Sequence, residues 1–524
     1  MKLRTIVKIA ITSSVVLLCS GFALYSFFRL SAAEGQKDFN LYELVPSTTS
    51  AVFVTDDVLE FVAEVDELTC SKNQQYLYVS KLFSYLKQSL YALSEDTPHG
   101  LSRQMNQMLI SFHEPDNERN QVLYCRLGNG DKELVNRFVR KYISSLYPPK
   151  TFIYKGEEII IYPMADGDFL ACYLTSDFMA LSFQKKLIEN VIDAYKSGKS
   201  LADDSTFTGI RAPKKSAAAA TIYTRMQGMM GWTEFDMKMK DDFIYFSGIT
   251  HDADTCFAFI NQLRQQQSVK GFPGEVLPST AFYFSRQGIT DWVSLLSYGN
   301  AQGQSVPART SEVQSRDKEF SRYLMENAGQ DLVACLFQRE DTLQGAAAVL
   351  SLSVADVTEA ERMLRALVNA ASADEGRRNP RITFCYTVNK AYPIYRLPQT
   401  TLFEQLTSFA EPTLDVYAAF YGGRLLLAPD ADALAHYIRQ LDKGEVLNGA
   451  MAYQTGMDHL SDSYHFMLMA DFDHIFQQSE NHVRFVPDFF LRNADFFRHF
   501  TLFVQFACAD GVVYPNIVLK YKSE

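Results

Sequence analysis

The chain has 524 residues, of which 47% are hydrophobic and 21% are charged, and its formal net charge is -11. This length suits two to four domains with sizeable cores, and the composition excludes a disordered chain and a multi-pass membrane protein. The acidic balance disfavours nucleic acid or anionic lipid as the main partner, because both are bound by basic surfaces.

The N-terminal region contains an uncharged apolar run of 20 residues, 9–28. A helix of that length spans a hydrocarbon core of about 30 Å. Lys2, Arg4 and Lys8 precede the run, so the positive-inside rule places the N-terminus in the cytoplasm. We therefore expect residues 1–40 to form a cytoplasmic tip, a signal-anchor helix and a short linker. The bulk of the chain is then periplasmic, on a single-pass protein of the bacterial inner membrane.

A cleaved signal peptide is the alternative for this region, because Ser31-Ala32-Ala33 resembles a small-residue cleavage site. The apolar region of a signal peptide is usually shorter, about 7 to 15 residues. A lipoprotein is disfavoured, because Leu18 precedes Cys19 where a small residue is expected. Both remaining alternatives, retained anchor and cleaved signal, predict export.

The rest of the chain shows an internal repeat. Residues 108–143 and 333–368 match in pattern without a gap, and each reads strand, polar turn, strand and amphipathic helix, with Asp131 or Asp356 at the helix start. LVPSTTSAVFV around Pro46 likewise matches VLPSTAFYF around Pro278. A third pair of blocks reads strand, turn, helix and then a glycine just past the helix end, Gly198 or Gly444.

Both halves then end in alternating strands. Phe235, Met237 and Met239 alternate with polar residues, and Asp510-Gly511 is a strong hairpin signal near the C-terminus. The sequence predicts an α+β protein with two tandem copies of an antiparallel-sheet-plus-helices unit, residues 41–268 and 269–524, after one transmembrane helix.

Three segments follow one another in the first half: LVPSTTSAVFV, then ISFH, then a strand-helix unit that ends in KSGKSLADDSTF. Together they resemble a family of uncharacterised envelope proteins of Bacteroidetes, grouped as a domain of unknown function. The resemblance covers the first half directly and the second half through the repeat. It implies a membrane-anchored extracytoplasmic protein, and it supplies no catalytic residues.

The cysteines lie far apart, and none forms a CxxC pair, which argues against a cysteine-based metal site. We expect most of them to be buried free thiols, with one or two disulfides as the alternative. The eight are Cys19, Cys70, Cys125, Cys172, Cys256, Cys335, Cys385 and Cys508.

Few residues suggest chemistry. Gly198-Lys199-Ser200 echoes a phosphate-binding loop but follows a predicted helix instead of opening one. Asp471, Asp473 and His474 form a dense acid-histidine cluster, and such ligands suit a divalent metal. They also follow an apolar strand, where an aspartate caps the next helix, and we expect capping, no metal and no cofactor.

Aromatic residues are abundant, with 39 Phe and 28 Tyr, and most are expected to fill sheet cores. Phenylalanines crowd residues 485–503, where Phe489, Phe490, Phe496 and Phe497 are the candidate contact surface for a partner or a ligand.

No Ser-His-Asp set, GxSxG elbow or HExxH motif is found in the sequence. The function we expect is therefore a non-catalytic, anchored binding or scaffolding protein of the envelope, with a protein partner and no nucleic acid. A carrier of a lipid or other hydrophobic ligand held between the two units is the alternative, and a hydrolase is the third.

Overall fold

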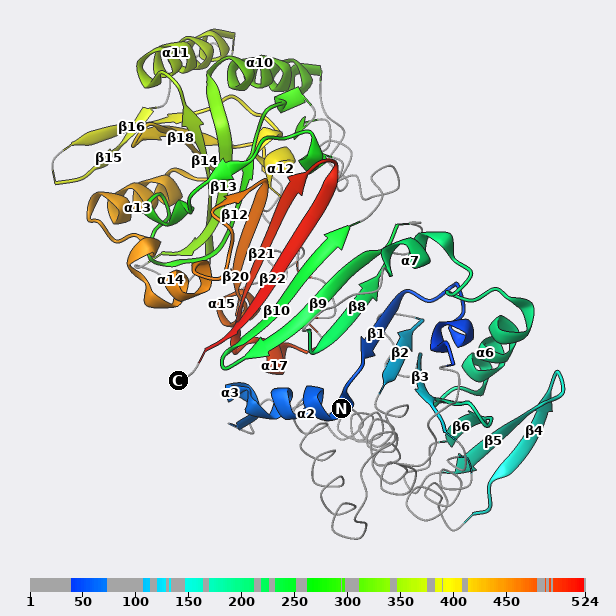
Figure 1. Ribbon diagram of the computed structural model, residues 1–524. Helices are drawn as coiled ribbons and strands as arrows, with labels where there is room; N and C mark the ends of the chain where they lie inside the picture. Colours follow the sequence, from blue (N-terminus) through cyan, green and yellow to red (C-terminus); the bar gives the residue numbers. More distant parts are fainter. Residues whose placement is uncertain are drawn as a thin grey trace. The chain divides into compact units, whose positions relative to one another are not determined.

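The computed structural model describes residues 39–72, 107–113, 120–128, 132, 147–163, 169–211, 218–225, 231–250, 262–293, 295–296, 311–339, 346–374, 382–388, 390–407, 413–477, 486, 490–491 and 493–522. The chain divides into two compact units, Met1–Thr255 with Ser523–Glu524, and Cys256–Lys522. Each unit combines antiparallel strands with helices, which confirms the predicted α+β class (Figure 1).

The division between the units lies N-terminal to the boundary expected from the sequence, between residues 268 and 269. The expected membrane anchor, residues 9–28, and most of the helix expected after Asp131 lie outside the described residues. Among the helices that the structure does describe, none has the length and apolar character needed to cross a bilayer.

The first unit is built on one sheet, in which every neighbouring pair of strands is antiparallel. The strand order is β10-β9-β8-β1-β2-β3-β7-β6-β5-β4. The strands are β1 Ala51–Thr55, β2 Met108–Phe112, β3 Gln121–Arg126, β4 Lys150–Tyr154, β5 Glu157–Pro163, β6 Phe169–Leu174, β7 Phe178–Ser182, β8 Ala220–Thr224, β9 Thr233–Lys240 and β10 Phe243–Thr250.

Side chains of this sheet alternate between two apolar layers, because successive residues of a strand point to opposite faces. Val52 and Val54 pack in one layer with α6 Lys185–Ser197, α7 Ser205–Ile210 and the 3₁₀ helix η1 Leu41–Leu44. Phe53, between them, packs in the other layer with α2 Val58–Glu67, which is followed by α3 Thr69–Lys72. Burial on both faces explains why the central strands of this sheet are mostly apolar.

The second unit is built on a sheet with order β22-β21-β20-β12-β13-β14-β18-β17-β16-β15, again antiparallel throughout. The strands are β12 Ala281–Gly288, β13 Ala328–Gln338, β14 Ala346–Val354, β15 Ile382–Tyr386, β16 Ala391–Arg396, β17 Tyr417–Tyr421, β18 Arg424–Ala428, β20 Phe466–Asp471, β21 Phe500–Ala509 and β22 Val512–Tyr521. A separate two-stranded ribbon pairs β11 Val269–Lys270 with β19 Ser463–Tyr464.

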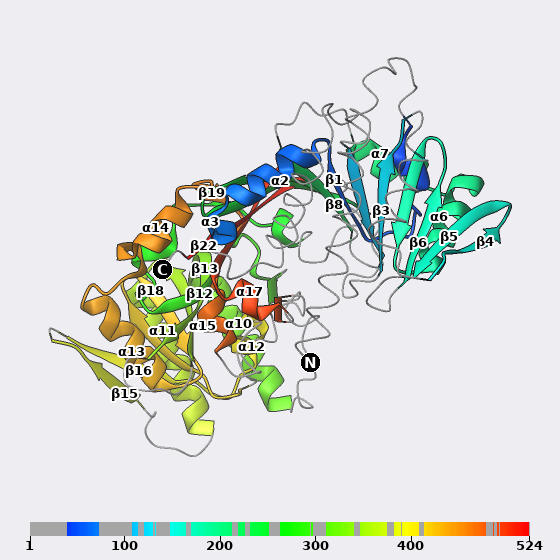
Figure 2. The same cartoon turned by 90° about the horizontal axis from the view of Figure 1, so that it is seen from below.

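Helices cover both faces of the second sheet. Tyr395 in β16 bonds α11 Val357–Asp374, which packs beside α10 Ser311–Asn327 (Figures 1 and 2). Cys385 in β15 points to the opposite face and contacts α13 Ala431–Asp442. The shorter helices are η2 Pro273–Glu275, α12 Leu402–Leu406, η3 Leu447–Gly449, α14 Met451–Met457, α15 Phe472–Phe476 and α17 Ala494–Phe497.

Several local predictions are confirmed. Gly198 follows α6 in the left-handed conformation with φ of 63°, so it is a helix cap and no phosphate loop. Asp356 caps α11, because its carboxylate accepts from the amides of Thr358 and Glu359 at 2.9 and 3.1 Å. Asp510 and Gly511 form the turn between β21 and β22, with φ of 50° and 80°.

The expected alternation in β9 is only partly right. Met237 is buried, whereas Phe235 and Met239 are half-buried, and the neighbouring carboxylate residue Glu234 is only 2% exposed. The two-layer packing of this sheet explains the difference, since both faces of a strand then meet protein. A prediction of burial from alternating apolar and polar residues assumes that one face of the strand is exposed to water.

The six cysteines within the described residues are free thiols, and all but Cys508 are buried. Burial raises the pKa of Cys172 to about 12 and that of Cys508 to about 11. These cysteines therefore behave as small apolar residues, as expected. Cys19 and Cys256 lie outside the described residues.

Candidate functional site

The acid-histidine cluster lies at the end of β20, in the second unit. Asp471 caps α15, since its Oδ1 accepts from the amides of Asp473 and His474 at 3.0 and 3.5 Å. Asp473 pairs instead with Arg498, whose Nη2 lies 3.0 Å from its Oδ1. Within the described residues, no group of three or more His, Cys, Asp or Glu side chains is placed to hold a metal ion.

Two basic side chains contact the Asp471 carboxylate. Lys522 Nζ lies 2.5 Å from Oδ1, and His474 Nδ1 lies 3.3 Å from Oδ2. Burial acts to raise the pKa of Asp471, but the His474 and Lys522 contacts outweigh it and lower that pKa. The same contact with Asp471 raises the pKa of His474 above 6.5, against the effect of its burial.

A cavity of about 190 Å³ lies beside this cluster. Asp471, His474 and Lys522 form its charged wall, and the His474 ring stacks on Phe282 with centroids 5.9 Å apart. Hydroxyl, aromatic and aliphatic side chains complete the lining; they include Ser279, Thr280, Thr501, Tyr453, Phe503 and Met469. The cavity therefore offers charge, hydrogen-bonding groups and flat apolar surface within one unit.

The candidate aromatic surface is partly an internal cluster. Phe490 and Phe497 lie 4.8 Å apart between centroids, and both pack against Phe472. Phe497 is buried, whereas Phe490 and Phe496 are half-buried. Phe489 lies outside the described residues. The described rings thus pack largely against one another, and their role as a contact surface for a partner or a ligand stays a prediction.

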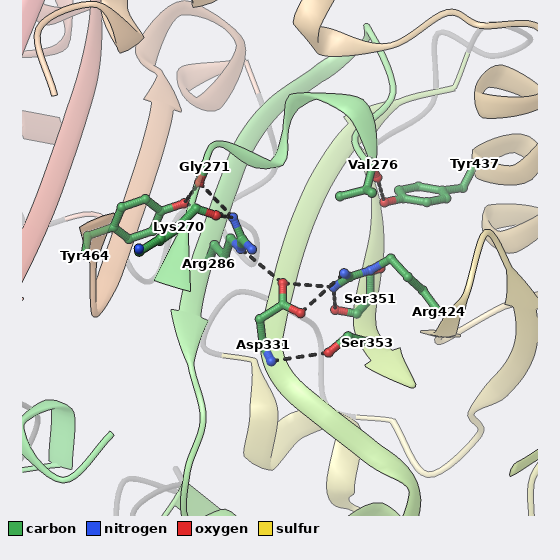
Figure 3. Close-up of polar contacts among 10 residues, drawn as sticks. All are labelled: Lys270, Gly271, Val276, Arg286, Asp331, Ser351, Ser353, Arg424, Tyr437 and Tyr464. Carbon is green, nitrogen blue, oxygen red and sulfur yellow. Dashed lines mark hydrogen bonds and ion pairs between the residues drawn. The ribbon is translucent and has the colours of Figure 1, made fainter. Parts of the chain in front are cut away.

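A buried charge network was not anticipated from the sequence. Arg286 in β12 and Arg424 in β18 both contact the Asp331 carboxylate in β13 (Figure 3). The Arg286 Nε lies 3.0 Å from Oδ2, and the Arg424 nitrogens lie 3.4 Å from the two oxygens. The three side chains are only 10 to 15% exposed.

The network ties separate elements together. Arg424 also donates to the Ser351 carbonyl in β14 at 2.9 Å, and Arg286 Nη1 donates to the Gly271 carbonyl at 2.8 Å (Figure 3). Burial acts to raise the pKa of Asp331, but the charges of Arg424 and Arg286 lower it below its usual value. A charged residue within the apolar run DLVACLF was the available signal, but its partners are distant in the chain.

The outermost strands carry exposed apolar side chains. In the part of the chain that the structure describes, β4 pairs only with β5, and β15 pairs only with β16. Thirteen large apolar side chains are exposed among the described residues, and six belong to these two strands or to the turn after β15. The six are Phe152, Ile153, Ile382, Phe384, Tyr386 and Val388.

Comparison with protein-family models, with curated proteins and with solved structures finds no match to this chain.

Proposed function

We propose that this chain is a membrane-anchored scaffolding protein of the bacterial envelope, which binds extended segments of a partner protein along the free edges of its two sheets. The observation that carries the proposal is the exposed apolar edge. Natural proteins usually protect an edge strand with charge, proline or a covering element, because its unpaired backbone groups recruit other strands. Strand β15 carries exposed Ile, Phe and Tyr instead, and β4 carries exposed Phe and Ile beside a single lysine, Lys150.

The edge of the second unit has the geometry of a docking strand. Ile382, Phe384 and Tyr386 share one face of β15, since alternate residues of a strand point the same way. Their exposed fractions are 37, 52 and 71%. A partner strand added there gains backbone hydrogen bonds along the edge and apolar contacts on that face.

We further propose that the two units are copies of one ancestral unit. The strand orders correspond position by position, with β1 matching β12 and the edge β4 matching β15. Hydrogen bonds recur at matched positions: Ser47 N donates to Lys199 O, and Ser279 N donates to Glu445 O. Leu201 N to Val45 O and Leu447 N to Leu277 O are a second such pair. These shared details support a common origin of the two units.

The match is not gapless, however. In the first unit Met108 pairs with Cys125. The gapless alignment of residues 108–143 with 333–368 would pair Val333 with Leu350, but Val333 pairs with Ser351. The pattern-based alignment is therefore one residue out of register in this hairpin, because hydrophobic pattern does not fix loop length.

The anchored, extracytoplasmic setting is the part of the proposal that rests on residues 9–28 and on the family resemblance. Asp471 caps a helix and pairs with Lys522, which favours a non-catalytic protein over a hydrolase. Phe472, Phe490 and Phe497 pack on one another, which makes them a poor lining for a hydrophobic ligand, so the proposal places binding at the sheet edges.

Lysine substitutions on the edges test the function. Ile153→Lys and Phe384→Lys should leave the thermal midpoint of the full-length protein unchanged, because both side chains are exposed. They should also reduce the size of the complex extracted from the native membrane in mild detergent. Met451→Lys is the matched control, since Met451 is 81% exposed but lies on α14. An unchanged complex in the Ile153→Lys, Phe384→Lys double variant would contradict the proposal.

A further inference from the structure

The cavity beside Asp471 corresponds to a filled site in the first unit, when positions are matched through the proposed duplication. β8 ends at Thr224, which pairs with Thr233, and the matching pair in the second unit is Ala470 with Leu502. The next residues toward the connection between the two strands are Arg225 and Trp232 in the first unit. They therefore correspond to Asp471 and Thr501 in the second unit. The turns of the hairpins β9–β10 and β21–β22 agree with this assignment, because Asp241 and Asp510 in these turns both have a φ of 50°.

In the first unit a guanidinium group occupies the site. The Arg225 group lies 4.8 Å from the centre of the Trp232 ring, and Nη1 lies 3.7 Å from an oxygen of Asp204. Its Nε donates to the Thr49 carbonyl at 3.0 Å, and Nη2 donates to the Ser47 carbonyl. A planar cation is thus held by one carboxylate, two backbone carbonyls and an aromatic face.

In the second unit three smaller side chains take these places. Ala450, which precedes α14 as Asp204 precedes α7, replaces the acid. Asp471 and Thr501 replace Arg225 and Trp232, and all three residues line the cavity. The space that the first unit fills with its own arginine and tryptophan is therefore open in the second.

The lining keeps the acceptors that suit a cation. Ser279 and Ala281 line the cavity at the positions of Ser47 and Thr49, whose carbonyls bind Arg225. Asp471 adds a carboxylate, and Tyr453 and Phe503 add aromatic surface. Lys522 and His474 already contact Asp471, but their side chains are 31% and 46% exposed, and the long lysine side chain can move aside for a ligand.

We propose that this cavity binds a planar cationic group, a guanidinium or amidinium, attached to a flat apolar body. Such a ligand would occupy the space that Arg225 and Trp232 fill in the first unit. It would donate to Asp471 and the backbone carbonyls and displace Lys522. The site is separate from the sheet edges proposed for partner binding.

Three isosteric probes test the charge of the ligand: benzamidine, benzamide and benzoate, titrated against the full-length protein in detergent by calorimetry. Benzamidine should bind at least about tenfold more tightly than benzamide, since hydrogen bonds to charged groups are stronger than those between neutral groups. Lys522→Ala should strengthen benzamidine binding, because it removes the competing cation. Tighter binding of benzoate, weaker benzamidine binding in Lys522→Ala, or no binding of any probe would overturn the proposal.

Variants then locate the site. Asp471→Asn keeps a capping side chain but removes the charge, so benzamidine affinity should fall about tenfold or more. Thr501→Trp should fill the cavity and abolish binding; if this variant fails to fold, Asp471→Asn still decides. Asp473→Ala, outside the cavity lining, is the control. Because Phe384→Lys should leave benzamidine binding intact, failure here is distinguishable from failure of the edge-binding function. Unchanged affinity in Asp471→Asn would overturn the assignment.

Discussion

Removal of Asp331 should strongly destabilise the second unit, because its carboxylate lies between two nearly buried guanidinium groups. Removing one partner of a buried ion pair leaves uncompensated charge and typically costs about 3 to 5 kcal/mol. We expect Asp331→Ala to lower the free energy of unfolding by about that amount in urea denaturation.

Asp415→Ala is the matched control for this loss. Asp415 pairs with Arg396 at 2.8 Å, but its side chain is 46% exposed. Exposed ion pairs contribute about 0 to 1 kcal/mol, so the control should be nearly neutral. Equal effects of the two substitutions would show that the Asp331 network adds no stability beyond a surface pair.

The contact between His474 and Asp471 makes stability depend on pH in a defined direction. The pKa of His474 is raised in the folded protein, so its stabilising contribution is present at low pH and is lost as pH rises through the folded pKa. The pKa of Asp471 is lowered, so its contribution is lost as pH falls through that value.

The thermal midpoint of His474→Gln should therefore fall furthest below that of the native protein near about pH 5.5, where both groups are charged. The difference should shrink as pH rises through the folded pKa of His474. Asp471→Asn should return the His474 pKa, followed by NMR titration, toward 6.5. A His474 pKa that stays raised in this variant would mean that another group is responsible.

At the scale of elements, the end of α6 depends on the left-handed conformation of Gly198. A side chain at φ of 63° is strained, at a cost of roughly 1 to 2 kcal/mol for an ordinary residue. We expect Gly198→Ala to destabilise the protein by about that amount in chemical denaturation.

Gly209 provides the comparison. It lies within the helix α7, and a methyl group there would meet no atom within 4 Å. Alanine at such a position is favoured over glycine by about 0.5 to 1 kcal/mol. If Gly209→Ala destabilises as much as Gly198→Ala, backbone conformation is not the cause of the Gly198 effect.

Local elements were the part of the fold that the sequence predicted best. Gly198, Asp356 and Asp510-Gly511 were identified correctly, because caps and hairpin turns depend on conformational preferences of one or two residues. The burial of Glu234 was missed, because it depends on a second layer of packing that period-two patterns do not reveal.

Sites assembled across strands were missed for a related reason. The contacts of Arg286, Asp331 and Arg424 require that β12, β13 and β18 be aligned through β14, and no local pattern specifies that alignment. The role of Lys522 at Asp471 is likewise a long-range contact. Sequence reasoning located the cluster around Asp471 but neither its cationic partner nor the adjacent cavity.

At the scale of the whole molecule, membrane topology is the prediction that rests on sequence alone. Because Lys2, Arg4 and Lys8 precede the apolar run, the rest of the chain should be outside the cytoplasm. A reporter enzyme fused after Glu524 should be active only when exported. N-terminal sequencing of the membrane-bound protein should find residue 1, whereas a soluble form beginning near Glu34 would indicate a cleaved signal peptide.

The most direct test of the edge-binding function is site-specific photo-crosslinking in cells. A photoreactive residue at Ile153 or at Phe384 should form a discrete adduct with a partner protein. The same residue at Met451 should not, although the Met451 side chain is more exposed than either. An adduct with twice the mass of the chain would identify a second copy as that partner. Failure of both edge positions to form an adduct, or equal crosslinking from Met451, would contradict the account.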